Sequence, residues 1–153
     1  MNIRKATMKD AQAIKGLNKK GFHHEFKLFD KTIDIDWPNK NDSYYRNAIS
    51  NKNFLTLVAE VEGEIRGYLI GSVTRAESYR KYSKLVELNN MFIIKEHRGK
   101  GIGTQLIQHF LKWAKNKKMK RARVVVSFAN IQGIETYKKN GFVGYDITME
   151  RNL

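Results

Sequence analysis

Apolar residues recur along the chain at two different spacings, which predict strands alternating with helices. Residues 3–6 indicate a short first strand, and Thr7 followed by Asp10 is typical of a helix N-terminus. The helix that follows could kink or break at Gly21, and its apolar stripe consists of Ala11, Ile14, Leu17 and Phe22. Residues 22–50 are irregular, and a second helix is predicted over 42–51.

Strand-forming residues dominate the middle of the chain. Two such runs, 54–61 and 65–73, are joined by Glu62-Gly63-Glu64, which predicts a β-hairpin. A charged loop over 75–84 leads to a fourth predicted strand, Leu85–Ile94.

The C-terminal half adds two helices and two more strands. An amphipathic helix with one face on the sheet is predicted from its apolar spacing: Ile102, Leu106, Ile107, Phe110, Leu111 and Ala114. Residues 122–128 predict a fifth strand, a short helix runs from Asn130 to a left-handed cap at Gly141, and residues 143–151 predict a closing strand. This order favours an α/β fold in which a mixed sheet carries helices on both faces, in one domain of residues 1–153.

Composition narrows the class of protein. The 153 residues suit one domain, and 41% hydrophobic with 29% charged residues is ordinary for a globular protein. No apolar run is long enough to span a bilayer, and the polar N-terminus lacks the pattern of a secretory leader. The chain has no cysteine, which excludes disulfides, thiolate nucleophiles and cysteine-based zinc sites. We therefore expect a cytoplasmic protein with no membrane partner.

The formal net charge of +14 is the one unusual bulk property, and it raises the expectation of a polyanionic partner. The lysines are scattered, however, and those over 112–120 lie at the end of a predicted helix, where cations are favourable without any partner. A nucleic-acid-binding domain is therefore a disfavoured alternative.

The most informative motif is Arg98-Gly99-Lys100-Gly101-Ile102-Gly103, a glycine-rich turn between a predicted strand and a helix. Glycines allow close approach of the backbone to a ligand, and a helix N-terminus offers free amides to a phosphate. The spacing fits neither of two common phosphate motifs. No glycine precedes Gly99 as a P-loop requires, and Thr104 stands where a dinucleotide fingerprint needs its third glycine.

The remaining pattern, Arg-x-x-Gly-x-Gly, resembles the acetyl-CoA pyrophosphate loop of the GCN5-related N-acetyltransferase (GNAT) family. The preceding segment 88–98 resembles that family's fourth strand, although Lys95 stands where members often carry proline. Residues 130–142 resemble its short helix with asparagine first, tyrosine inside and Gly-Phe after it. The strong resemblance covers 84–145 and implies the GNAT-like acyl-CoA N-acyltransferase fold, with six to seven mostly antiparallel strands.

The resemblance also implies where acetyl-CoA binds. Backbone amides of the loop are expected to hold the pyrophosphate, aided by the side chains of Arg98 and Lys100. The residues concerned are Arg98, Gly99, Lys100, Gly101, Ile102, Gly103 and Thr104. Pantetheine is expected along the main chain of Met91, Phe92 and Ile93, where an amide could also stabilise an oxyanion. Asn130 is expected to contact pantetheine, to cap its helix, or both.

Two residues are expected to carry the chemistry. Tyr137 is the candidate general acid for the departing thiolate, although a packing tyrosine would fit the same position. Glu87 is the candidate base for the incoming amine, directly or through water, although a solvated acid at a strand start is the plainer interpretation. Simple alternation puts Glu87 with Asn89 and Met91 on one face, opposite Leu88, Asn90 and Phe92.

These observations favour an enzyme that moves acetyl from acetyl-CoA to a primary amine in a ternary complex. The alternatives are a catalytically weak CoA-binding regulatory module and the nucleic-acid-binding domain. The acids between Glu25 and Asp42 would suit a cationic acceptor on a small molecule or protein. No metal is expected, because His23-His24 has no third ligand. A homodimer, common in the family, is a possible assembly.

Overall fold

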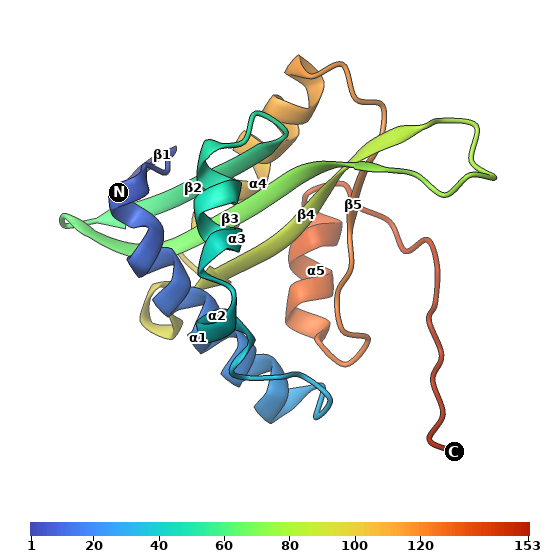
Figure 1. Ribbon diagram of the computed structural model, residues 1–153, viewed down its shortest axis with the longest axis horizontal. Helices are drawn as coiled ribbons and strands as arrows, with labels where there is room; N and C mark the ends of the chain where they lie inside the picture. The colour runs from blue at the N-terminus through green and yellow to red at the C-terminus, as the bar shows by residue number, and fades with distance from the viewer.

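The computed structural model describes residues 1–153 as one mixed sheet with helices on both faces (Figure 1). Its strands are β1 (Asn2–Lys5), β2 (Phe54–Val61), β3 (Glu64–Arg75), β4 (Lys84–Ile93) and β5 (Ala122–Val124), and they follow one another across the sheet in chain order. Its helices are α1 (Ala11–Leu28), α2 (Trp37–Lys40), α3 (Asp42–Ser50), α4 (Ile102–Asn116) and α5 (Ile131–Lys139), with short 3-10 turns at Met8–Asp10 and Lys95–His97. No helix combines the length and apolar character needed to cross a membrane.

Two separate apolar clusters hold the layers together. On one face, α1 and α3 cover the sheet through Ile14, Leu17 and Tyr45. On the other face, α4 packs Leu106 and Phe110 against β2, β3 and β4. The expected fold class, with helices on both faces, is therefore confirmed.

Several expected elements are present almost as predicted. The hairpin of β2 and β3 turns through Glu62 and Gly63, both with positive φ. Thr7 and Asp10 form a reciprocal capping box, and Gly141 ends the last helix with φ of +85°. The helix α1 continues through Gly21, where the sequence allowed a kink or break, and the missing side chain lets the helix approach the Phe92 ring of β4.

The strand count is lower than the six to seven expected, because the C-terminal part of the sheet is incomplete. Three strand pairs are antiparallel, and β5 pairs with β4 in parallel over only three residues, Val86–Leu88 with 122–124. The strand expected over 122–128 therefore ends at Val124. The closing strand expected over 143–151 is not formed, since this segment lies away from the free edge of β5 (Figure 1).

Candidate functional site

The glycine loop after β4 presents a row of free amides. Gly99 and Gly101 adopt left-handed conformations with φ of +73° and +80°, and nothing lies within 4 Å of where their side chains would begin. None of the six amides from Gly99 to Thr104 donates to a protein acceptor. Three of these amides belong to the loop and three to the first turn of α4, where the helix dipole adds positive potential. The loop is thus a cradle of unpaired donors, as the expected anion site requires.

The first residue of the loop differs from the rest. The Arg98 amide donates to the Lys95 carbonyl at 3.2 Å, so it is not among the free donors. The Arg98 side chain turns back toward the sheet, where its Nε donates to the Ile93 carbonyl at 2.8 Å and its guanidinium lies over the Phe92 ring. Lys100, by contrast, is exposed at the loop. Arg98 thereby ties the loop to the end of β4.

A gap opens between β4 and β5 next to this loop. A bulge in β4 skips Asn89, because Ile70 pairs with Asn90 while Gly71 pairs with Leu88. Beyond the bulge β4 pairs only with β3, and its side toward β5 has no strand partner. The main chain of Met91–Ile93, expected to contact pantetheine, lies along this open stretch.

The bulge also overturns the predicted faces of β4. Val86 and Leu88 pack in the same cluster as Met91 and Ile93, on the α4 face. Glu87 therefore does not share a face with Met91, because one extra residue reverses the alternation. It lies instead on the face of Asn90 and Phe92, opposite to the prediction.

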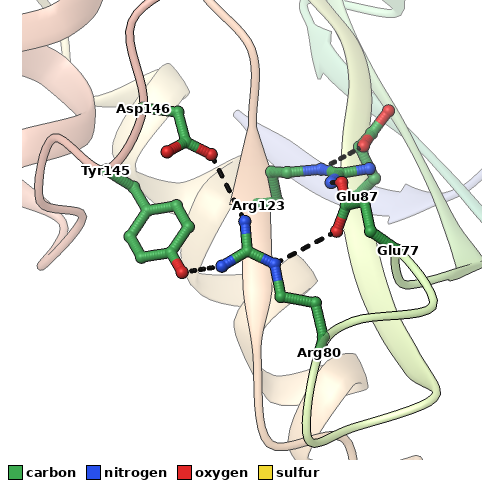
Figure 2. A network of polar contacts seen from close by, with 6 residues as sticks. All are labelled: Glu77, Arg80, Glu87, Arg123, Tyr145 and Asp146. Carbon is green, nitrogen blue, oxygen red and sulfur yellow. Dashed lines mark hydrogen bonds and ion pairs between the residues drawn. The ribbon is translucent and has the colours of Figure 1, made fainter.

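Glu87 is held in a charged network rather than facing open space (Figure 2). Its Oε2 accepts from Arg123 Nε at 2.6 Å, and Arg123 also contacts Glu77 at 2.8 Å. Glu77 in turn binds Arg80, which reaches Tyr145 and Asp146 of the C-terminal segment. The predicted base is thus a link between β4, β5 and the β3–β4 hairpin.

A cavity of about 230 Å³ lies at the gap between β4 and β5. Its walls come from α1, β4, the β5 end and α5, and it includes the predicted Met91, Phe92, Asn130 and Tyr137 but not Glu87. The other lining residues include Glu25, His24, Asn18, Asn90 and Val125. A larger, shallow hollow of about 640 Å³ is lined only by residues 75–78 and 80–84 of one hairpin, away from the glycine loop.

Asn130 and Tyr137 reach the cavity from α5. The Asn130 Oδ1 accepts from the Gly133 amide at 2.9 Å, so this residue caps its helix as predicted and also lines the cavity. Tyr137 packs edge-to-face on Phe142. Its pKa is raised to about 12, mainly by burial and additionally by the nearby Glu25 carboxylate. Its phenol therefore stays protonated at neutral pH and is available as a hydrogen-bond donor.

Glu25 is the functional candidate that the sequence analysis did not single out. It belongs to α1 and lines the cavity. Its pKa is raised, mainly by burial and additionally by the Asp30 carboxylate. Its neighbour His24 also lines the cavity, with a pKa lowered by burial and by Arg98. Of the acids between 25 and 42, only Glu25 lines the cavity, since Asp34 and Asp42 pair with surface lysines. The spacing of Ile14, Asn18, Gly21 and Glu25 along one helical face is the signal that could have found it.

A buried polar network supports the cavity floor. Asn18 donates to the Tyr68 hydroxyl at 2.7 Å and to Asn90 Oδ1 at 3.2 Å, and Asn90 donates to the Tyr44 hydroxyl at 2.9 Å. Tyr68 and Asn18 are 1% and 2% exposed. Such a satisfied network fixes the bulged part of β4 against α1.

Comparison with known proteins agrees with this geometry. The model of the acetyltransferase (GNAT) family matches residues 22–142. An uncharacterised N-acetyltransferase of Archaeoglobus fulgidus is 28% identical over 106 residues, which are 68% of this chain and 71% of that protein. An uncharacterised N-acetyltransferase of Bacillus subtilis is 42% identical over 55 residues, 36% of this chain, and the match spans only 22% of that relative's length.

Among solved structures, a predicted acetyltransferase of Clostridium acetobutylicum, determined with acetyl-CoA, superimposes with a TM-score of 0.79. It is 25% identical, and the match covers 99% of this chain and 95% of that one. The expected fold is therefore confirmed, with five strands in place of six to seven.

Proposed function

Because the chain belongs to the GNAT family of acetyltransferases, we propose that it transfers acetyl from acetyl-CoA to a primary amine by direct attack in a ternary complex. The proposal rests on three features that lie next to one another. The six free amides of the glycine loop adjoin the unpaired edge of β4, and that edge borders the cavity lined by Glu25 and Tyr137. The free amides suit a pyrophosphate. The unpaired β4 main chain over Met91–Ile93 suits an amide-bearing chain such as pantetheine.

Glu25 is proposed to accept the proton of the attacking amine. As the nitrogen attacks the thioester carbonyl, a C–N bond forms and the nitrogen becomes acidic enough to lose its proton to a carboxylate. The raised pKa of Glu25 makes it a better acceptor than an ordinary solvated carboxylate. Glu87 stays a prediction for the same role through water, but its carboxylate already binds Arg123.

Tyr137 is proposed to donate a hydrogen bond, and finally its proton, to the sulfur as the C–S bond breaks. The negative charge of Glu25 is one cause of the raised pKa of Tyr137. When Glu25 takes the amine proton that charge is neutralised, so Tyr137 becomes a stronger acid as the thiolate departs. An amide of the bulged β4 main chain is proposed to stabilise the oxyanion between these two steps.

The cavity favours the reacting end of a cationic amine as acceptor. Its volume of about 230 Å³ is below the roughly 300–1,000 Å³ typical of sites that enclose a whole drug-sized ligand. Glu25 supplies the charge to attract an ammonium group, and the half-buried Asn90 also lines the cavity. The rest of the acceptor would then lie outside, as fits the end of a polyamine or a lysine side chain.

The test is a steady-state measurement of CoA thiol release over a panel of primary amines. We expect turnover that depends on both acetyl-CoA and amine, with kcat falling in Tyr137→Phe. Glu25→Gln should lose the acidic limb of the pH–rate profile, whereas Glu87→Gln should keep it. Tight CoA binding with no turnover on any amine would instead support the regulatory-module alternative. An unchanged rate and pH profile in Tyr137→Phe would refute its role as acid.

A further inference from the structure

Basic residues gather at one end of the sheet. The strands β2, β4 and β5 begin at this end and β3 ends there. The C-terminus of α4 reaches it too, because the Lys117 Nζ donates to the Lys52 carbonyl, just before β2, at 2.9 Å. Residues that are far apart in the sequence therefore form one surface, which we call the basic end: Lys52, Arg75, Lys81, Lys84, Lys117, Lys118, Lys120 and Arg121.

The positive charge of the basic end is not neutralised within the protein. None of its eight residues forms an ion pair. The acids that come near, Glu77 and Asp146, both bind Arg80. At the opposite end of the sheet, the β2–β3 turn carries Glu62 and Glu64. Unpaired like charges repel one another, so their concentration at one end favours a polyanionic partner.

Tyrosine rings alternate with arginines beside this surface. The Arg121 guanidinium lies over the rings of Tyr82 and Tyr145, at 5.6 and 5.3 Å from their centroids. The Arg80 guanidinium lies over the rings of Tyr145 and Tyr79, at 4.6 and 5.2 Å (Figure 2). Tyr79 is 77% exposed, so its ring is accessible to a further planar group. Exposed aromatic rings next to cations are what single-stranded nucleic acids bind, through stacked bases and paired phosphates.

We propose that the basic end binds single-stranded nucleic acid, with its lysines on the phosphates and a base stacked on Tyr79. An acidic protein would match the charge but would make no use of the exposed ring. In a duplex the bases are stacked on one another, whereas a single strand can turn a base out onto an aromatic side chain. The ring next to the cations therefore favours a single strand.

This surface is separate from the proposed acetyl-CoA site. The strand β4 begins at Lys84, in the basic end, and finishes at Ile93, near the glycine loop. Its ten residues span about 30 Å. Nucleic acid and acetyl-CoA would thus occupy opposite ends of β4 and bind without competing. The proposal does not depend on acetyl transfer.

Fluorescence anisotropy with a labelled oligouridylate of about 12 nucleotides tests the role of the lysines at increasing salt concentration. We expect saturable binding. The slope of log affinity against log salt should become shallower by about 2, at roughly 0.7 per phosphate contact, in a variant that neutralises three lysines of the basic end: Lys81→Gln, Lys84→Gln and Lys120→Gln. The matched control should keep the wild-type slope, because it removes the same charge from exposed lysines elsewhere: Lys9→Gln, Lys20→Gln and Lys139→Gln. An unmodified chain that does not bind the oligonucleotide, or equal changes in both variants, would overturn the proposal.

Tyr79→Ala distinguishes nucleic acid from other polyanions. It should weaken oligouridylate binding about tenfold, because the stacked base is lost, whereas Tyr79→Phe should bind as the wild type does. Binding of heparin, which carries charge but no bases, should be the same in all three proteins. An unchanged affinity of Tyr79→Ala for the oligouridylate would overturn the proposal in favour of an acidic protein partner. Tighter binding of a duplex of the same length would overturn it in favour of double-stranded nucleic acid.

Discussion

Replacing Gly101 by alanine separates the cost of backbone strain from the cost of a lost ligand contact. Gly101 has φ of +80°, and an added Cβ would meet nothing within 4 Å. The variant therefore pays only the left-handed strain in the free protein, roughly 1–2 kcal/mol. Thermal unfolding should show this as a fall in Tm of a few degrees.

The effect on CoA affinity should be larger than this strain alone would cause. The added methyl group lies among the free amides of Gly99–Thr104, where a pyrophosphate must approach closely. Losing one charge-assisted hydrogen bond there costs about 1.5–3 kcal/mol. Isothermal titration with CoA should therefore show at least about a tenfold weaker affinity.

Gly63→Ala is the matched control. Gly63 has φ of +78°, also with nothing within 4 Å, but it lies in the β2–β3 turn. It should lose a similar amount of stability and bind CoA as the wild type does. Equal CoA affinity in the Gly101→Ala and wild-type proteins, or equal losses in both variants, would refute the assignment of the loop as the pyrophosphate site.

Three further changes test stability. Glu25→Gln should stabilise the protein at neutral pH, because folding raises the pKa of this carboxyl and the folded state therefore becomes less stable as the group ionises with rising pH. Thermal melting of both proteins at pH 7 and at pH 4 tests this, since the gain in stability should vanish at the lower pH. Arg4 lowers the pKa of Asp10 from 3.8 to about 2, so the ionised carboxylate contributes about 2 kcal/mol to the free energy of unfolding above pH 4. In urea unfolding, Asp10→Asn should lose this amount, and its free energy of unfolding should fall less steeply between pH 4 and pH 2 than that of the wild type. Gly71→Ala would bring a Cβ to 2.5 Å from the Phe110 ring and should cost about 1–3 kcal/mol, whereas an unchanged urea midpoint would show that the ring moves freely.

Local patterns in the sequence were sufficient to predict most of the elements. The turn at Gly63, the helix after Gly101 and the cap at Gly141 all depend on residues within a few positions, so composition and spacing reveal them. The length of β5 depends on a distant feature instead. The bulge at Asn89 separates β4 from β5 after Val124, and no short pattern announces it.

The same bulge explains why Glu87 lies on the other face of β4 from the one predicted. Strand alternation places Glu87 correctly only if no extra residue intervenes before Met91, and one does. Glu25 was overlooked because its place in the cavity depends on α1 lying across β4, which the absence of a side chain at Gly21 permits. Both depend on tertiary packing: the face of Glu87 on the register between β3 and β4, and the position of Glu25 on the contact of Gly21 with the distant Phe92.

The most direct test of the proposed donor site is to titrate CoA into the isotopically labelled protein and follow the backbone amide resonances. The account predicts that the largest shifts fall on Gly99–Thr104, with a second group on Met91–Ile93, and that the β2–β3 turn at Gly63 stays unchanged. Saturable CoA binding whose largest shifts lie outside the glycine loop and the open edge of β4 would contradict it.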